Sequence, residues 1–406
     1  MGLQRRDKYE MSVSSVDQEL SELRVAVIRG PNLNKFEMQS YEPLTKKYDL
    51  TAYTTYNHRF EIDGIDIRIR KLHCFEEFAE GVPFPLSRLC LSLIYRSGYH
   101  SYMLGLEKEL KDKDIAHVAE THNRYSYQAV RTRERLGRPK VAVTAWENIP
   151  FRIGSDFVPE VRKGADVFIA ATERAKKTLM LEGIGEGRIH VVPAGVDLDR
   201  FRPRRKNREL LQRLELTEDD LIVLFIGRLA WEKGIHDLIY AAKMTSQDPE
   251  LNGKPIKFLI VGTGVERESI LQEAKILQVS ENVRLVGNVP YMEIHEYHNI
   301  GDMLVLPSIL TRSWQEQFGM VLAEAMASGN PVISTSSGSI PEVVGDCGLL
   351  VQPGDSVSLY HAIRKLATDE ELRMSMGRRA RIRAEKRFDS RKTADQIGAI
   401  YEALVS

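Results

Sequence analysis

Cysteine is scarce in this sequence. Only three cysteines occur among 406 residues, and they stand far apart at Cys74, Cys90 and Cys347. Because no C-x-x-C pair occurs, the sequence indicates neither a structural zinc site nor a disulfide framework, and we expect a reducing, cytoplasmic setting. No H-x-x-x-H spacing and no carboxylate cluster suggests a catalytic metal, so we expect that no metal is required.

Long hydrophobic runs and a net charge are missing as well. No window approaches the roughly 18 apolar residues that a membrane span needs, and residues 1–22 are polar and charged without the apolar core of a signal peptide. We therefore expect 1–22 to be a polar N-terminal extension. Lys plus Arg and Asp plus Glu number 57 each. A net charge of zero argues against a dedicated nucleic-acid-binding protein, which would be basic overall.

The sequence does contain short apolar runs that alternate with stretches of helical period. Continuous apolar runs indicate parallel sheets covered on both faces, and the pattern occurs twice, which predicts two doubly wound α/β domains. We place them at 23–204 and 205–386, and we expect ligands in the cleft between them. The expected strands are 23–29, 115–119, 141–145, 167–171, 221–226, 257–261, 283–286, 303–306 and 331–334, and helices include 99–110, 126–136, 173–183, 235–243 and 320–328.

The stretch EQFGMVLAEAMASGNP at 316–331 contains the start of a short helix. The free amides at Gly319, Met320 and Val321 would bind phosphate, assisted by the helix dipole. Glu316 precedes the helix and Glu324 lies inside it, so the two carboxylates would hydrogen-bond different parts of an extended ligand. A solvated helix position is the alternative for Glu324.

The stretch GRLAWEKG at 227–234 follows an apolar strand and precedes a helix. Arg228 offers a planar fork for phosphate oxygens, and Lys233 offers a compact positive charge. Together with a helix N-terminus they would hold a diphosphate and stabilise it as a leaving group. The alternative is that both cations are solvated surface residues.

With these motifs the sequence resembles the family 4 glycosyltransferases of the two-domain GT-B architecture. The resemblance covers about residues 23–400 and is strongest in the C-terminal half. Its motifs are the E-x7-E pair Glu316/Glu324, the GR-x4-KG stretch, VVPAGVD, IVGTG, VRLVGNVP, LPS and GSIPEVVGDCGLLVQPGD. It implies two Rossmann-like domains that face a central cleft. It also implies a UDP- or GDP-linked sugar as donor and retention of configuration, with a sugar, lipid-linked or small-molecule hydroxyl as acceptor in glycan or glycolipid synthesis.

The resemblance also implies roles for individual residues. Arg228 and Lys233 would hold the diphosphate, Glu316 the sugar hydroxyls and Glu324 the ribose, while backbone near 286–288 would meet the base. Residues 387–406 would form a helix that crosses back to the N-terminal domain. The predicted donor site comprises Gly30, Arg228, Lys233, Gly287, Glu316, Phe318, Gly319, Met320, Val321 and Glu324.

The N-terminal half departs from the family pattern at two places. Pro31 follows Gly30 where a second glycine is common, and Glu147 stands near the position at which many relatives carry a histidine. Glu147 would accept a hydrogen bond or stabilise positive charge at the anomeric carbon; a cap or salt bridge is the alternative. The predicted catalytic set is Glu147, Arg228, Lys233 and Glu316, and the predicted acceptor side is Asn32, Asn34, His117, Glu120, His122 and Asn148.

Other classes of protein fit less well. IVGTG lacks the third glycine of a dinucleotide fingerprint, which argues against an NAD enzyme, and no obvious carboxylate pair indicates a glycoside hydrolase. A catalytically degenerate scaffold or sensor that binds nucleotide sugars is the alternative function. The basic stretches at 131–140 and 378–391 are typical of solvated helix faces. The first would also allow peripheral contact with anionic lipid at the inner membrane face.

Overall fold

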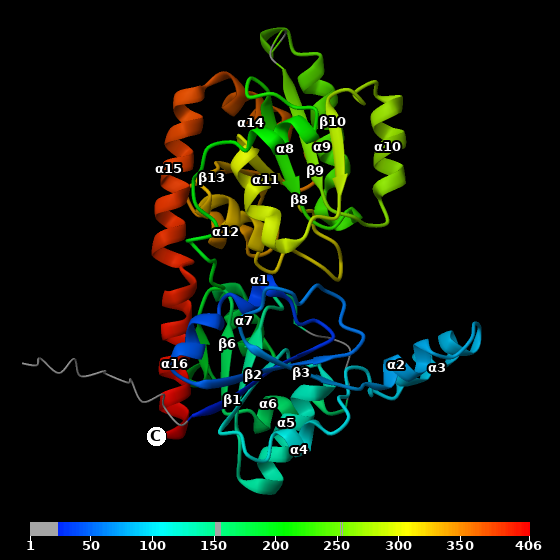
Figure 1. Cartoon of the computed structure of the whole chain (residues 1–406), viewed down its shortest axis with the longest axis vertical. Coiled ribbons are helices and arrows are strands. Elements are labelled where there is room, and N and C mark those ends of the chain that lie inside the picture. Colours follow the sequence, from blue (N-terminus) through cyan, green and yellow to red (C-terminus); the bar gives the residue numbers. More distant parts are fainter. Residues whose placement is uncertain (1–22, 151–155, 252, 254) are drawn as a thin grey trace, which may run out of the picture.

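Two parallel β-sheets, each covered by helices on both faces, make up the computed structural model, which describes residues 23–150, 156–251, 253 and 255–406 (Figure 1). The N-terminal sheet has the strand order β3-β2-β1-β4-β5-β6-β7 and the C-terminal sheet has the order β10-β9-β8-β11-β12-β13. Neighbouring strands within each sheet are parallel. The predicted pair of doubly wound α/β units is confirmed.

In the N-terminal sheet the strand order reverses between β1 and β4. The carboxyl ends of these two strands therefore face the cleft. Its strands are β1 (Arg24–Gly30), β2 (Asp49–Thr55), β3 (Arg68–Leu72), β4 (Ile115–Ala119), β5 (Lys140–Ala145), β6 (Val167–Ala170) and β7 (Ile189–Val191). Its helices are α1 (Lys35–Met38), η1 (Glu42–Lys46), α2 (Phe75–Glu80), α3 (Leu86–Arg96), α4 (Leu106–Glu109), α5 (Arg124–Leu136), α6 (Val158–Gly164), α7 (Glu173–Leu181) and η2 (Glu186–Arg188).

The C-terminal half repeats this architecture around β8 and β11. Its strands are β8 (Leu221–Ile226), β9 (Ile256–Val261), β10 (Val283–Gly287), β11 (Met303–Leu306), β12 (Val332–Thr335) and β13 (Gly348–Val351). Its helices are α8 (Arg208–Arg213), η3 (Trp231–Lys233), α9 (Ile235–Ser246), η4 (Pro249–Leu251), α10 (Arg267–Ile276), η5 (Tyr291–Glu293), α11 (Ile294–Ile300), α12 (Met320–Ala327), α13 (Ile340–Val344), α14 (Ser356–Thr368) and α15 (Glu370–Arg387).

The last helix, α16 (Ser390–Val405), leaves the C-terminal half and packs on the N-terminal sheet (Figure 1). The chain crosses beside the VVPAGVD turn, where the amide of Val196 donates to the carbonyl of Phe388 at 2.6 Å and the amide of Ser390 donates back to Val196 at 3.0 Å. A Cβ on Gly195 would lie 2.5 Å from the Cα of Ser390. Glycine at this position therefore permits the close crossing.

One helix prediction is wrong. Within the expected helix 99–110 only Leu106–Glu109 is helical, because Ser101 and Gly105 both adopt positive φ values, 60° and 82°, that interrupt a helix. The strands β2, β3, β7 and β13 were not predicted. Among the described residues, none of the helices combines the length and apolar character needed to cross a membrane.

Candidate functional site

A cavity of about 540 Å³ lies between the two halves of the molecule. Loops after β1, β4 and β5 line it from the N-terminal half, and loops after β8 and β11 with η5 and α12 line it from the C-terminal half. The cavity brings together most of the predicted site residues: Asn32, Asn34, Glu120, His122, Glu147, Arg228, Lys233, Glu316, Phe318, Gly319, Met320, Val321 and Glu324.

Glu316 is held in place by bonds from both halves. Its side chain is buried, and its Oε2 accepts from Lys233 Nζ and from Ser308 Oγ, each at 2.7 Å. The carbonyl of Glu316 accepts from Nδ2 of Asn148 at 2.6 Å. The side chain of Lys233 also lies over the ring of Trp314, 4.7 Å from its centroid. The carboxylate is therefore fixed at the cavity wall beside a positive charge.

Positive charge gathers on the C-terminal side of the cavity. Gly319 caps α12 with φ 81°, a left-handed conformation that favours glycine, and the first amides of α12 have no partner within the helix. The helix therefore presents its positive dipole end there. Arg228 also lines the cavity, and its side chain is 64% exposed. It forms an ion pair with Glu232, four residues further along the chain.

The glycines of IVGTG serve backbone packing. A Cβ on Gly262 would lie 1.9 Å from the carbonyl oxygen of Gly227, and one on Gly264 would lie 2.1 Å from that of Leu229. The amide of Leu229 donates to the carbonyl of Thr263 at 2.8 Å. The loop after β9 thus stacks against the loop that carries Arg228. Close backbone packing therefore explains why this stretch has two glycines although it lacks the third glycine of a dinucleotide fingerprint.

Two carboxylates approach each other on the N-terminal side of the cavity. Oε1 of Glu120 accepts from the amide of Trp146 at 2.7 Å and from that of Glu147 at 3.3 Å. Burial and the charge of Glu147 raise the pKa of Glu120 well above its ordinary value. Burial also raises the pKa of Glu147, opposed by a hydrogen bond from Gln317. The site therefore favours protons on this pair.

His122 also lines the cavity. Burial, then the charges of His100 and Arg162, lower the pKa of His122 to about 4. Its imidazole is therefore neutral near pH 7.

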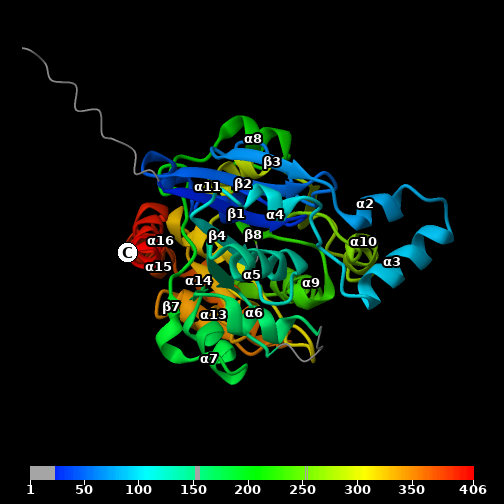
Figure 2. The ribbon, with the colours of Figure 1, turned by 90° about the horizontal axis from the view of Figure 1, so that it is seen from below.

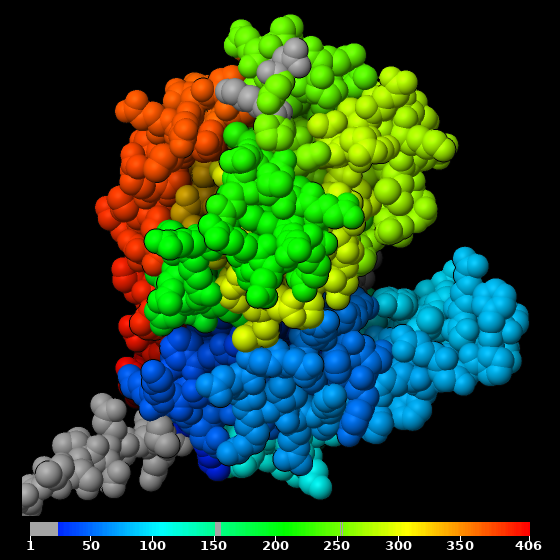
Figure 3. All heavy atoms as spheres, turned by 45° about the horizontal axis from the view of Figure 1, so that its top comes forward, coloured from blue at the N-terminus to red at the C-terminus, as the bar shows by residue number. Residues whose placement is uncertain are grey.

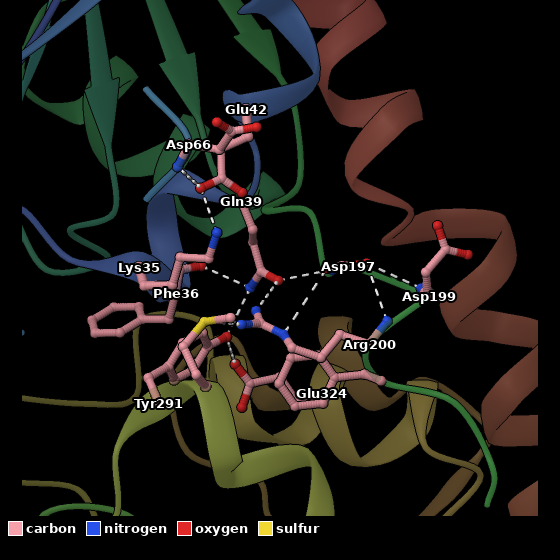
Figure 4. Close-up of polar contacts among 12 residues, drawn as sticks. Lys35, Phe36, Gln39, Glu42, Asp66, Asp197, Asp199, Arg200, Tyr291 and Glu324 are labelled. Carbon is pink, nitrogen blue, oxygen red and sulfur yellow. Dashed lines mark hydrogen bonds and ion pairs between the residues drawn. The ribbon is translucent and has the colours of Figure 1, made fainter. Parts of the chain in front are cut away.

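Glu324 takes part in a network that spans both halves (Figure 4). Its Oε1 accepts from the hydroxyl of Tyr291 at 2.5 Å, and that hydroxyl accepts from Nε2 of Gln39 at 3.0 Å. Oε1 of Gln39 accepts in turn from the amide of Asp197 at 2.8 Å and from Arg200 at 3.4 Å. Gln39 follows α1, and Asp197 belongs to the connection between the sheets, so the network ties both to η5 and α12.

Four predicted residues do not line the cavity. His117 is fully buried, and its ring nitrogens contact the hydroxyls of Tyr401 and Thr144, both at 2.6 Å, so it braces α16. Asn148 contacts the backbone of Glu316 instead. Gly30 packs against the ring of Tyr125, and the carbonyl of Gly287 accepts from the amide of Gly262. These four groups therefore differ from the predicted acceptor and donor sets in that they do not line the cavity.

Several residues that line the cavity were not predicted from the sequence. The buried Arg29 ends an apolar strand, and its Nε donates to Glu37 at 2.6 Å while its NH2 group donates to Tyr41 at 2.7 Å. An arginine at the end of an apolar run is the signal that would have found it. The other unpredicted lining residues include Phe36, Glu37, Phe60, Asn123, Tyr125, Trp146, Tyr291 and Gln317.

Over residues 23–150, 156–251, 253 and 255–406, no three His, Cys, Asp or Glu side chains come together in a way that would hold a metal ion.

The chain is similar in sequence to known glycosyltransferases. Residues 206–383 match the family model described as glycosyl transferases group 1. The D-inositol 3-phosphate glycosyltransferase of Nocardia farcinica is 30% identical over 295 residues, which cover 70% of this chain and 63% of that protein. The N-acetyl-alpha-D-glucosaminyl L-malate synthase of Bacillus anthracis is 33% identical over 202 residues, 49% of each chain. The chain thus spans between about half and 63% of the length of these relatives.

Solved structures show the same fold. The Anabaena protein HepE, crystallised in complex with UDP, has a TM-score of 0.73 and 18% identity, over 94% of this chain and 100% of its own. The sucrose-phosphate synthase of Thermosynechococcus elongatus has a TM-score of 0.70 and 21% identity, over 94% and 99%. The predicted GT-B architecture is confirmed, and so is the resemblance to glycosyltransferases.

Proposed function

We propose that this chain, whose residues 206–383 match the family model of the glycosyl transferases group 1, transfers a hexose from a nucleoside-diphosphate sugar to a hydroxyl acceptor. The observation that carries the proposal is the contact of 2.7 Å between Lys233 and Glu316 in the same cavity as the N-terminus of α12. This contact sets a cation and a sugar-binding carboxylate side by side, as transfer from a diphosphate leaving group requires.

In this proposal the diphosphate lies against Arg228, Lys233 and the first turn of α12. Negative charge grows on the phosphate oxygens as the bond to the anomeric carbon breaks, and fixed donors stabilise it without reorganising. Because the charges come from the chain itself, the proposed mechanism requires no metal. Glu316 orients the sugar through its hydroxyls, and Glu324 binds the ribose.

The reaction forms a bond between the acceptor oxygen and the anomeric carbon while the bond from that carbon to the phosphate oxygen breaks. The acceptor's proton passes to the departing phosphate oxygen, on the same face of the sugar, so that configuration is retained. Glu147 stands on the opposite side of the cavity, where its carboxyl group, once ionised, would stabilise the positive charge that develops at the anomeric carbon. The acceptor would contact Asn32, Asn34, Glu120 and His122.

We expect UDP to be the nucleoside diphosphate of the donor. Three solved structures of similar fold contain UDP, UDP with glucose, or UDP-glucose, all bound to HepE. GDP is the alternative, because base contacts in the cavity would run through backbone. The acceptor is a sugar, a lipid-linked sugar or a small molecule with a free hydroxyl.

The first test is thermal stability against UDP, GDP, ADP, their sugars and NAD. A ligand at about 100 times its Kd adds roughly 2.7 kcal/mol to the free energy of unfolding, which moves Tm by a few degrees for a chain of this size. A shift with one nucleoside diphosphate supports the donor site and fixes the base. If nucleoside-diphosphate sugars bind but no acceptor panel yields product, the result favours the alternative of a catalytically degenerate scaffold or sensor. If none of them binds, the proposal fails.

A further inference from the structure

A helical arm projects from the N-terminal half, away from the cavity-forming body. It consists of α2 and α3 (Phe75–Arg96), which pack on each other and stand clear of the sheets in two perpendicular views (Figures 1 and 2). The space-filling view shows the same protrusion (Figure 3). Although α3 has the sequence LSRLCLSLIYR, none of its residues is buried.

The apolar residues of α3 divide into two sets. Cys90, Leu91 and Ile94 are half-buried, whereas Leu86, Leu89 and Leu93 are exposed by 56%, 57% and 56%. The exposed set follows the spacing i, i+3, i+7, so it forms one stripe along the helix. Phe84, 78% exposed, precedes α3 at the tip of the arm. Exposed apolar area of this kind marks a binding surface.

The arm is firmly held at its base. The guanidinium of Arg124 lies 4.7 Å from the ring centroid of Tyr99, 4.6 Å from that of Tyr127 and 4.7 Å from that of Phe157. The ring of Phe75 also stacks on Tyr102 at 5.4 Å. These contacts anchor both ends of the segment, so the apolar stripe is presented in a fixed position.

The charge of this segment is one-sided. Residues 81–106 contain Arg88 and Arg96 but no aspartate or glutamate, in a chain in which acidic and basic residues are equal in number. On α2, Glu76 is buried and accepts from the amide of Ser101 at 2.6 Å, whereas Glu80 is exposed. Arg96 flanks the exposed stripe, and Arg88 is exposed on another side of the same helix. The arm therefore carries positive charge that complements an anionic surface.

The stripe is small for a protein partner. An 11-residue helix is about 16 Å long, and one face about 10 Å wide covers far less than the roughly 800 Å² per partner that a stable complex buries. A lipid surface has no such threshold, because each leucine that enters the headgroup region contributes separately.

We propose that the arm docks on an anionic lipid bilayer. Leu86, Leu89 and Leu93 enter the interface together with Phe84, while Arg88 and Arg96 lie among the headgroups. This surface is separate from the cavity, so its binding does not depend on the proposed transferase activity.

Flotation of the full chain with vesicles, in the absence of nucleotide, tests this proposal. We expect the protein to float with vesicles of phosphatidylcholine and phosphatidylglycerol, and the bound fraction to fall with added salt as charges are screened. The double variant L89E/L93E should bind at least about tenfold more weakly. Its Tm should stay unchanged, since both leucines are exposed.

The matched control is I276E on α10, which places the same charge at an apolar residue 70% exposed in the other half. It should float like the unaltered chain, and R88Q/R96Q should lose the preference for phosphatidylglycerol. The proposal is overturned if the unaltered chain stays unbound or if L89E/L93E floats equally well. It is also overturned if light scattering detects a dimer that L89E/L93E dissociates, because the stripe would then join two copies of the chain.

Discussion

The hydroxyl of Tyr291 donates a hydrogen bond to Oε1 of Glu324 at 2.5 Å, and Gln39 from the other half of the molecule donates to the same hydroxyl. Burial, then the charge of Glu324, raises the pKa of Tyr291 well above its ordinary value. The phenol therefore stays protonated and can serve only as a donor to the carboxylate. A ligand hydroxyl that binds this oxygen must share it with Tyr291.

Replacing Tyr291 with phenylalanine should destabilise the protein. Hydrogen bonds to charged groups contribute about 1.5–3 kcal/mol, and the variant also removes the acceptor of Gln39. Urea unfolding of Y291F measures the loss. The control is Y360F, which removes a hydrogen bond to Asp248 and should cost less, because Arg364 still pairs with that carboxylate. Equal stability of Y291F and the unaltered chain would contradict the network.

Replacing Glu316 with glutamine should abolish sugar transfer and largely preserve nucleotide binding. The amide keeps the size of the side chain but loses the charge that Lys233 and Ser308 hold in place. Product formation and calorimetric titration with the nucleoside diphosphate separate the two effects. E268Q on α10, where the carboxylate is 83% exposed, is the control and should behave like the unaltered chain. Normal turnover by E316Q would show that Glu316 has another role.

Replacing Arg228 with glutamine should weaken nucleoside diphosphate binding without lowering Tm. The side chain is 64% exposed and pairs with Glu232, so the fold does not depend on it. Loss of one charge-assisted phosphate contact corresponds to about 10- to 100-fold in Kd. A titration at two salt concentrations measures this. The exposed R267Q on α10 is the control, and an unchanged Kd for R228Q would exclude Arg228 from the diphosphate site.

Replacing Glu120 with glutamine should make the protein more stable above neutral pH. The pKa of Glu120 is raised in the folded state, mainly by burial, so the folded protein binds more protons than the unfolded chain, and stability falls as pH rises through that pKa. The E120Q variant does not lose stability in this way, because glutamine does not titrate. Urea unfolding from pH 5 to 9 measures the difference in slope, at about 1.4 kcal/mol per pKa unit. Parallel pH profiles would show that Glu120 titrates normally.

Most of the strands that could be predicted are buried on both faces. Met303–Leu306 is an unbroken apolar run and Ile115–Ala119 is apolar except at His117, and each was predicted with its observed bounds. In contrast, β3 has the sequence RIRKL and lies at a sheet edge with mostly exposed side chains. A strand at the edge of a sheet is less covered than a central one, so its side chains need not be apolar. The sequence of β3 therefore contains no apolar run that would predict a strand.

The sequence by itself determined the local parts of the site. The spacing of Glu316, Gly319 and Glu324 fixes a loop, a helix start and a helix position, because those relations depend only on neighbours in the chain. The tertiary structure alone decided which groups meet. Gln39 and Tyr291 are 252 positions apart, and Asn148 and Glu316 are 168 apart. Such pairs form only when two separately folded sheets face each other, and no periodicity or spacing records that arrangement.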